Sequence, residues 1–378
     1  MSLVALIKLW RFACIYGPGR TYFKVAGRMR LALPIWPWAR RAPDVGVIGC
    51  GQFAFANIGY FVRNVFKRRV LVCYDLDSAA RDSLARAQHA HHVTNSAAEL
   101  LGTPGLRTVY IASNHATHAA YAAQALALGL DVYVEKPIAV THAQLVVLLR
   151  AQRASSGRLF AGYNRPFSGA IRDLRRAMTI DAKCGFSIQC FVSGHQLAPG
   201  HWYRRPDEGT RVCGNIGHWL DLMIHLLAWR GMPDRLLIVM ACADPSEPDD
   251  NLSIAITSDC GDVFSVMLTS RSEPFEGINE SIHVQHGATI CKIDDFRRMT
   301  LWQGARLVRY RYWPKDVGHR LAIGQPFEGA ATRDWHEVEL STLLMLHITD
   351  MVRGGAVQSV FYLSHSWQRL QHDISSTL

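Results

Sequence analysis

The sequence predicts an α/β protein with two domains: a doubly wound parallel sheet, followed by an α+β domain with an open, mainly antiparallel sheet. Its 378 residues are too many for one ordinary core. Between residues 44 and 134, short apolar runs alternate with helical patterns, as in a parallel sheet covered on both faces. From Phe186 to about Val308, runs with alternating apolar positions are separated mainly by turns, which predicts antiparallel or mixed pairing.

These patterns divide the chain into four segments. Residues 1–43 form a basic and apolar N-terminal segment, 44–160 the first domain, 161–330 the second domain, and 331–378 a helical C-terminal segment. Inside the second domain, Gly217–Trp229 is the one clear helical pattern. We expect the helices of the last segment to return and pack on the first domain.

The composition is that of a globular protein: 49% of the residues are hydrophobic and 19% are charged. No stretch reaches about 18 consecutive apolar residues, so we expect no membrane-spanning helix. The nine cysteines are scattered and form no CxxC pair, which favours reduced thiols in a cytoplasmic protein.

The net charge of +10 is concentrated at the N-terminus. Eight of the 41 lysines and arginines lie within residues 1–43, which contain no acid, so 33 basic and 31 acidic residues remain for the rest. A nearly neutral body argues against a nucleic-acid partner.

Two interpretations of residues 1–43 stay open. Apolar residues accompany the basic ones, at Leu3, Leu6, Ile7, Leu9, Trp10, Phe12, Tyr22, Phe23, Ile35, Trp36 and Trp38. Such a segment could lie on an anionic membrane surface, giving a peripherally membrane-associated protein. The alternative is an arm that packs on the protein's own surface or on a partner subunit.

A dinucleotide site is predicted where the organised sequence begins. The apolar run 45–48 leads into the GxGxxA motif Gly49-Cys50-Gly51-Gln52-Phe53-Ala54, and a helical pattern follows from Phe55 to about Phe66. Gly49 permits the tight turn, Gly51 lets the backbone approach a pyrophosphate, and Ala54 allows close packing of helix and strand. This is the Rossmann arrangement, although the glycines could also form an ordinary strand–helix turn.

The next strand ends in an acid that favours NAD. Asp75 follows the run 69–74 and lies twenty-four residues after Gly51. There a carboxylate accepts hydrogen bonds from ribose hydroxyls and repels a 2′-phosphate. Arg81 keeps NADP open as the less favoured cofactor, and Asp75 could instead be a turn residue.

Several separated motifs resemble the Gfo/Idh/MocA family of oxidoreductases. They are the glycine-rich loop, Ile111-Ala112-Ser113-Asn114-His115-Ala116-Thr117-His118, Val134-Glu135-Lys136-Pro137, and Gly162-Tyr163-Asn164-Arg165-Pro166-Phe167-Ser168. Further short segments most resemble one subgroup of that family; they lie at residues 194–196, 201–202, 214–221, 249–251, 294–298 and 315–319. Its module often follows an alcohol-dehydrogenase-like half, and its members are associated with polysaccharide metabolism.

The resemblance implies hydride transfer between a nicotinamide and a hydroxyl of a sugar, cyclitol or nucleotide sugar. It implies Lys136 and His218 as catalytic residues. It places the cofactor against Gly49, Gly51, Gln52, Phe53, Ala54, Asp75, Ser113, Asn114, His118, Glu135 and Lys136. The expected substrate ligands are Tyr163, Asn164, Arg165, His201, Trp202, Asn215 and Asp221. It also implies a homo-oligomer formed through the open sheet face, and no metal is needed.

One departure from the family pattern bears on the chemistry. Many members have an acid three or four residues before the histidine, where this chain has Asn215 and Gly214. An amide cannot take a proton at neutral pH, so proton handling would fall to Lys136 and His218. Two other functions therefore stay open: a glycosidase that uses transient oxidation by a retained NAD, and a dinucleotide-binding sensor or regulator without catalysis.

Overall fold

The computed structural model describes residues 3–33, 41–272, 274, 277–328 and 332–376. The expected apolar cluster Ile35-Trp36-Pro37-Trp38 lies outside the described residues. The chain divides into two compact units, and each is described by itself. We call Phe12–Gly162 with His319–Arg333 the Rossmann unit, and Met1–Arg11, Tyr163–Gly318 and Asp334–Leu378 the sheet unit.

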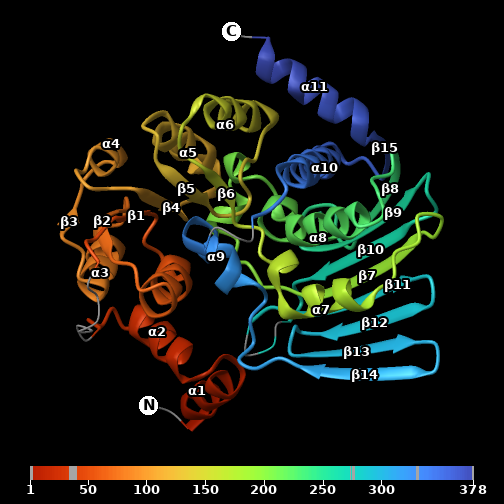
Figure 1. The fold of residues 1–378 in the computed structure, drawn as a ribbon, viewed down its shortest axis with the longest axis horizontal. Coiled ribbons are helices and arrows are strands. Elements are labelled where there is room, and N and C mark those ends of the chain that lie inside the picture. The colour runs from red at the N-terminus through yellow and green to blue at the C-terminus, as the bar shows by residue number, and fades with distance from the viewer. Residues whose placement is uncertain (1–2, 34–40, 273, 275–276, 329–331, 377–378) are drawn as a thin grey trace. The chain divides into compact units, whose positions relative to one another are not determined.

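The Rossmann unit contains the predicted parallel sheet, with strand order β3-β2-β1-β4-β5-β6 (Figure 1). The strands are β1 (Val45–Ile48), β2 (Val70–Tyr74), β3 (His92–Val93), β4 (Thr108–Ile111), β5 (Asp131–Val134) and β6 (Leu159–Ala161). Every residue of β1, β2 and β4 is buried, because helices cover both faces of the sheet. The predicted fold class of this part is confirmed.

Four α-helices lie between β2 and β6, and three of them begin at side-chain caps. They are α3 (Ser78–Gln88), α4 (Ala97–Leu101), α5 (His118–Ala127) and α6 (His142–Ala154), with the short 3₁₀ turn η3 (His115–Thr117) before α5. Asp77, Ser96 and Thr141 accept backbone N–H groups at the starts of α3, α4 and α6. The helix predicted after the glycine-rich loop forms, with π-helical turns η1 (Ala54–Ile58) and η2 (Phe61–Val65) inside it.

A late segment, α9 (His319–Glu328), completes the Rossmann unit. The Tyr110 hydroxyl donates to the Ile323 carbonyl oxygen at 2.6 Å. A Cβ atom on Gly324 would lie 2.4 Å from the Phe66 ring, so only glycine permits this approach to the helix after the loop.

The N-terminal segment forms α1 (Leu3–Tyr16) and α2 (Pro18–Arg28). Phe23, Ala26 and Leu33 are buried in the same core as Val45 and Phe55. The interpretation of an arm that packs on the protein's own surface is therefore confirmed for residues 21–33. None of the described helices is long and apolar enough to cross a membrane.

The sheet unit is built on nine strands in the order β14-β13-β12-β11-β7-β10-β9-β8-β15. They are β7 (Phe186–Ser193), β8 (Arg235–Cys242), β9 (Asn251–Ser258), β10 (Val263–Thr269), β11 (Asn279–His286), β12 (Thr289–Asp294), β13 (Arg298–Gln303), β14 (Arg306–Arg311) and β15 (Gln358–Tyr362). Only β7 and β10 pair in parallel among these described strands; the other neighbours are antiparallel. Alternate residues of β7 are buried and exposed, as expected for a sheet with one covered face.

Helices cover that buried face. They are α7 (Gly169–Ala177), α8 (Gly217–Ala228) and α10 (Trp335–Gly354), and a π-helical turn, η7 (Val212–Ile216), leads directly into α8. A Cβ atom on Gly217 would lie 2.7 Å from Met345 Sδ, which shows how closely α8 approaches α10.

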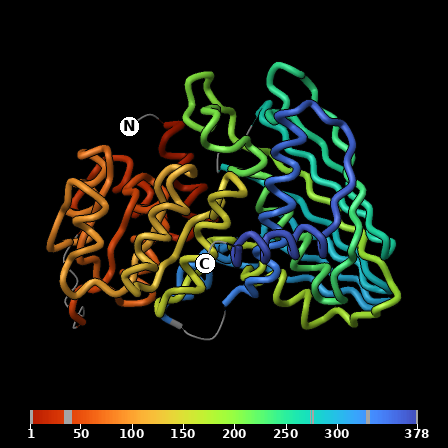
Figure 2. Tube along the Cα trace, turned by 90° about the horizontal axis from the view of Figure 1, so that it is seen from above, coloured from red at the N-terminus to blue at the C-terminus, as the bar shows by residue number. Residues whose placement is uncertain are grey.

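The C-terminal segment does not return to the first domain, so that expectation was wrong. Helix α10 packs along α8, β15 extends the nine-stranded sheet beside β8, and α11 (Leu363–Ser375) follows it. Figure 2 shows this blue end of the chain beside the strands of its own unit. The buried side chains of α10 pack on α8, so its apolar face and not its position in the sequence decides its place. Strand β15 was not predicted from the sequence.

Candidate functional site

The candidate cofactor residues of the Rossmann unit lie along the carboxyl edge of the parallel sheet. Gly49, Ala112 and Glu135 directly follow β1, β4 and β5, and each donates its backbone N–H to the last residue of the neighbouring strand, at 2.8 to 2.9 Å. This register places the glycine-rich loop, Ser113 and Lys136 in one row. In open parallel sheets ligands bind at this edge.

The glycine-rich loop has the geometry that a pyrophosphate requires. Gly49 has φ +86°, and a Cβ atom there would lie 2.4 Å from the Ser113 nitrogen, so both the turn and the contact with β4 need glycine. A Cβ atom on Gly51 would meet nothing within 4 Å. The backbone of Gly51 therefore faces open space at the N-terminus of a helix, where phosphates bind.

Asp75 is held against this loop. Its Oδ2 accepts the Cys50 N–H at 2.6 Å, and its Oδ1 accepts the Asp77 N–H at 2.8 Å. Each carboxylate oxygen keeps a second lone pair, so the group can also accept from ribose hydroxyls. The residues of the loop and Asp75 thus fit a bound NAD.

Gln52 and Phe53 begin the helix after the loop. Gln52 is exposed, and its Nε2 donates to the Lys24 carbonyl oxygen at 3.1 Å, so the N-terminal arm fixes its side chain. The Phe53 ring lies 5.7 Å from the His319 ring, edge to face. Ala54 is buried, as expected of the small residue that lets the helix pack on the sheet.

Lys136 is half-buried and follows a fully buried carboxyl group. Glu135 accepts the Tyr133 hydroxyl at 2.7 Å and the Lys136 backbone N–H at 3.3 Å. Burial raises the pKa of Glu135 to about 7, although the neighbouring Lys136 charge acts in the opposite direction. Glu135 can therefore be protonated near neutral pH, directly before Lys136 in the chain.

His118 holds two loops of this edge together. Its Nδ1 lies 2.8 Å from the Pro137 carbonyl oxygen and its Nε2 3.0 Å from the Ser113 carbonyl oxygen. Burial lowers the pKa of His118, which favours the neutral ring with one donating nitrogen. With both nitrogens facing protein carbonyls and 1% of its surface exposed, its expected cofactor contact is indirect. Asn114 is half-buried at the start of η3, beside it.

A separate group of candidate residues lies in the sheet unit, where η7 runs into α8. His218 is the second residue of α8 and is half-buried, and Asn215 lies three residues earlier with 6% of its surface exposed. Residues three apart in a helix share a side, so the amide and the imidazole belong to one surface.

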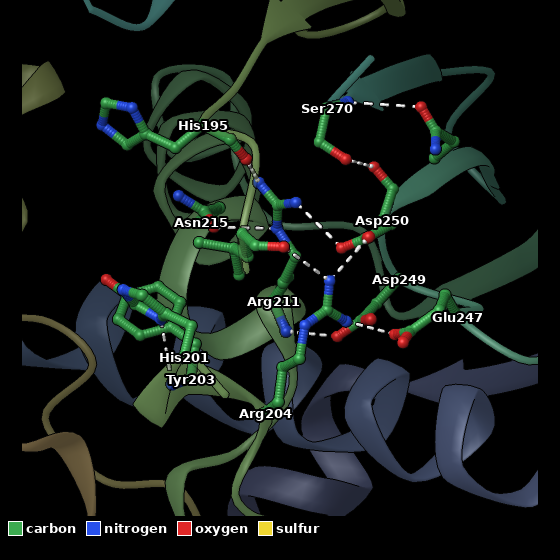
Figure 3. Close-up of polar contacts among 12 residues, drawn as sticks. His195, His201, Tyr203, Arg204, Arg211, Asn215, Glu247, Asp249, Asp250 and Ser270 are labelled. Atoms are coloured by element: carbon green, nitrogen blue, oxygen red, sulfur yellow. Dashed lines mark hydrogen bonds and ion pairs between the residues drawn. The ribbon is translucent and has the colours of Figure 1, made fainter. Parts of the chain in front are cut away.

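A buried arginine orients Asn215 (Figure 3). Arg211 is 2% exposed; its Nε donates to Asn215 Oδ1 at 3.4 Å and its Nη2 to the His195 carbonyl oxygen at 2.7 Å. A guanidinium has no acceptor, so the amide must turn its oxygen toward Arg211. Asn215 then presents its Nδ2 group, a pure donor, away from Arg211.

Asp250 connects this arginine to the neighbouring loop. It accepts Arg211 Nη1 at 3.0 Å and Arg204 Nη2 at 2.8 Å, while the Arg211 backbone N–H donates to Asp249 at 2.6 Å (Figure 3). Burial acts to raise the pKa of Asp250, but the hydrogen bonds from both arginines outweigh it and the pKa is lowered. Glu247 also pairs with Arg204. These three acids lie close enough together to hold a cation, but two guanidinium groups pair with Glu247 and Asp250, and Asp249 accepts a backbone N–H.

His201 and Trp202 lie in the loop that Arg204 anchors. His201 Nδ1 accepts the Tyr203 N–H at 3.2 Å and so caps the 3₁₀ turn η5 (Trp202–Arg204). Burial is the main cause that lowers the pKa of His201, and nearby arginines add to it. The Trp202 ring stacks on the His201 ring at 5.8 Å and is partly exposed, so both residues can still meet a substrate.

Four expected substrate ligands have structural roles instead. Tyr163 is 1% exposed and its hydroxyl contacts Met345 Sδ at 3.9 Å, and Asn164 Nδ2 donates to the Val317 carbonyl oxygen at 2.8 Å. Asp221 is fully buried and accepts the Ser341 hydroxyl at 3.1 Å, which ties α8 to α10. Because these side chains are committed inside the core, a direct substrate contact is not supported for them.

The fourth is Arg165, at the start of the 3₁₀ turn η4 (Arg165–Phe167). It makes two hydrogen bonds to Glu280, at 2.8 and 3.0 Å, and both side chains are at most 5% exposed. Trp219 Nε1 donates to the same carboxylate at 2.8 Å. A buried bidentate pair of this kind gives Arg165 a structural role inside the sheet unit.

Sequence reasoning missed Arg211 and Asp250. Arg211 lies seven residues before His218, which is two helical turns, and that spacing was the available signal. Asp250 lies in the segment 249–251, which resembles the family but to which the sequence assigns no role. Its partner is 39 residues away, and sequence spacing does not reveal such a contact.

The parallel sheet, the glycine-rich loop and Asp75 together are the features of a dinucleotide-binding Rossmann domain. Residues 44–163 match the model of the Gfo/Idh/MocA "Oxidoreductase family, NAD-binding Rossmann fold". Over these residues the chain is similar to that family, whose model describes an NAD-binding Rossmann fold.

Similar proteins agree with this placement. Inositol 2-dehydrogenase of Burkholderia multivorans is 30% identical over 186 residues, which are 49% of this chain and 54% of the relative. That of Gluconacetobacter diazotrophicus is 31% identical over 134 residues, 35% of this chain and 40% of the relative. The chain thus spans about half the length, or less, of these curated relatives.

Solved structures share the fold over most of the chain. Levoglucosan dehydrogenase in complex with NADH has a TM-score of 0.70 and 13% identity, covering 85% of this chain and 99% of that one. GenD2 from gentamicin A biosynthesis, in complex with NAD, has a TM-score of 0.69 and 16% identity, covering 87% and 99%. At these identities the likeness extends the shared fold to the sheet unit.

Proposed function

We propose that this chain is an NAD(H)-dependent oxidoreductase that acts on a hydroxyl group of a sugar, cyclitol or nucleotide sugar. One observation carries the proposal: the glycine-rich loop, Asp75 and Lys136 lie along the carboxyl edge of a single parallel sheet. The inositol and levoglucosan dehydrogenases among the similar proteins support a polyol or sugar substrate.

The residues divide the work between binding and proton handling. Gly49, Gly51 and Asp75 would hold the dinucleotide, which supplies the hydride chemistry when bound. Lys136 would donate a hydrogen bond to the substrate oxygen, and Glu135 beneath it would set the charge around the ammonium. His218 would move the proton, since a histidine titrates near neutral pH.

The finer parts of the proposal rest on the sequence resemblance. We place the reaction in polysaccharide or glycan biosynthesis in the cytoplasm. We also propose a homo-oligomer formed through the open face of the nine-stranded sheet. Apolar side chains there support it, because Phe191, Met267 and Val263 are 46 to 51% exposed.

We propose that α1 makes the peripheral membrane contact. Leu3, Leu6, Ile7 and Trp10 are 48 to 72% exposed on this helix, while the rest of the described arm is partly buried. Cosedimentation with phosphatidylserine vesicles, compared with phosphatidylcholine vesicles, tests this contact. Equal recovery of the wild type and of a Trp10→Ser variant in the supernatant would contradict it.

Asn215 favours keeping a second candidate function, a sensor or regulator that binds the dinucleotide without turnover. Its side chain is turned by Arg211 into a donor, where relatives have an acid. A glycosidase that reuses a retained NAD would turn over its substrate without net formation of NADH.

The test is a titration of the purified chain with NADH and NADPH, followed by absorbance assays with NAD and myo-inositol, levoglucosan or UDP-glucose. We expect NADH to bind more tightly than NADPH, and turnover that disappears in Lys136→Ala but persists in the exposed control Lys183→Ala. Binding without turnover on this panel would favour the sensor. Failure to bind either dinucleotide would refute the proposal.

A further inference from the structure

The N-terminal arm packs directly on the first turn of the dinucleotide-binding helix. Besides the bond from Gln52 to the Lys24 carbonyl oxygen, Arg20 pairs with the Asn57 side chain. A Cβ atom on Gly27 would lie 2.9 Å from the Phe55 ring and 3.0 Å from Gln52 Oε1. The absence of a side chain at Gly27 is what allows α2 to lie against the residues that follow the glycine-rich loop.

The arm then crosses to the end of the site where the adenosine belongs. The Leu33 carbonyl oxygen lies 2.8 Å from His89 Nε2, at the end of α3. Between these anchors, Arg30 Nη2 lies 3.7 Å from Asp77 Oδ2. Asp77 in turn donates its backbone N–H to Asp75, the expected ribose ligand. The Arg30 guanidinium is therefore at the adenosine end of the loop.

The backbone around Arg30 is fixed, although its side chain is half exposed. Arg30 has φ +53°, and Leu31 N–H donates to the Ala26 carbonyl oxygen at 2.9 Å. Ala26 is 0% and Leu33 3% exposed, so buried residues hold both sides of this turn. A left-handed arginine kept in place by such anchors presents its side chain to one region of the surface.

The charges of this region favour an adenosine with an arginine beside it. Residues 12–33 contain no acid, whereas Asp75 and Asp77 bring two carboxylates to the ribose position. A guanidinium close to them offsets their negative charge, which would otherwise repel the phosphates of a dinucleotide. Its planar, weakly hydrated group can also stack on an adenine ring.

We propose that Arg30 forms the outer wall of the adenosine subsite and contacts the adenosine half of the bound dinucleotide. This inference rests on the proposed function, because it assumes that the loop binds NAD. It extends the cofactor site beyond residues 44–163, to a segment that precedes the part of the chain matched by the family model.

Calorimetric titrations with three probes test the proposal: NADH, ADP-ribose and nicotinamide mononucleotide. The variants are Arg30→Ala, Arg30→Lys and the control Arg28→Ala, which removes an equal charge from an exposed position of the same arm. We expect Arg30→Ala to weaken NADH and ADP-ribose about three- to tenfold and to leave nicotinamide mononucleotide unchanged. Arg30→Lys should recover part of the loss, and Arg28→Ala should stay within about twofold.

Thermal unfolding of each variant checks that the arm is still packed. Equal effects of Arg30→Ala and Arg28→Ala would reduce the result to general electrostatics and overturn the contact. Unchanged ADP-ribose binding in Arg30→Ala would overturn it as well. Failure of the wild type to bind NADH and ADP-ribose would instead refute the proposed function.

Discussion

Replacing Asn215 by aspartate tests the Arg211–Asn215 contact, on which the chemistry of the sheet unit depends. The new carboxylate would lie near Arg211 Nε, which is 3.4 Å from the present amide oxygen. Two unit charges at that distance attract by about 5 kcal/mol at an effective dielectric constant of 20. Asp250 already shares the guanidinium and offsets part of this, so we expect a coupling of about 3 kcal/mol.

The attraction is matched by the cost of burying the new charge, which is several kcal/mol in a site this enclosed. Asn215→Asp alone should therefore change the free energy of unfolding by less than about 2 kcal/mol. In an Arg211→Met background the same replacement loses its partner and should cost about 3 kcal/mol more.

Urea unfolding of the two single variants, the double variant and the wild type at pH 7 measures this coupling. Arg204→Met is the matched control, because Arg204 contacts Asp250 and makes no recorded contact with Asn215. A coupling below about 1 kcal/mol, or one of equal size with Arg204→Met, would show that Arg211 does not orient Asn215. If the chain turns over a substrate, Asn215→Asp should also add an ionisation to the pH profile of kcat/KM.

Three further outcomes are expected. Burial raises the pKa of Glu135 to about 7 from an ordinary 4.5, so the folded chain binds the Glu135 proton more tightly than the unfolded chain does. The free energy of unfolding should therefore fall by about 3 kcal/mol as the pH rises from 4.5 to 7. Urea unfolding at pH 4.5 and 8 should show that loss in the wild type but not in Glu135→Gln. Burial also raises the pKa of Cys213 to about 11, so iodoacetamide at pH 8 should alkylate the exposed Cys260 and spare Cys213, as read by mass spectrometry; early labelling of Cys213 would contradict its burial. Arg165→Met should destabilise the fold by about 3 to 5 kcal/mol, because Glu280 stays buried with its charge. A large rise in KM with unchanged stability would restore Arg165 as a substrate ligand.

The Rossmann unit was predictable because its signals are local. A buried run such as 45–48, a glycine that needs φ +86° at Gly49 and an acid after the next strand each occupy adjacent residues. Their spacing reflects how a strand, a turn and a helix must follow one another. The order of the strands then follows from the preference for right-handed crossover connections.

The candidate residues of the sheet unit were harder to interpret from the sequence, because their side chains are satisfied by residues far along the chain. Arg165 meets Glu280 across 115 positions, and Asp221 meets Ser341 across 120. A polar residue in a family motif is predicted as a ligand unless the partner that buries it is known. The same limit applied to β15, whose pairing with β8 joins residues more than a hundred positions apart.

The orientation of Asn215 limits which groups can move a proton in this site. Because Arg211 takes its oxygen, the amide can donate a hydrogen bond but cannot accept the proton of a substrate hydroxyl. A donor stabilises an oxygen that carries negative charge, as a carbonyl does when it is reduced. Since reduction and oxidation share one transition state, the amide would stabilise charge on the substrate oxygen in both directions, and under the proposed function the proton would be handled by His218 or Lys136. An acid introduced at position 215 would supply an acceptor and should therefore change the pH profile of turnover in both directions.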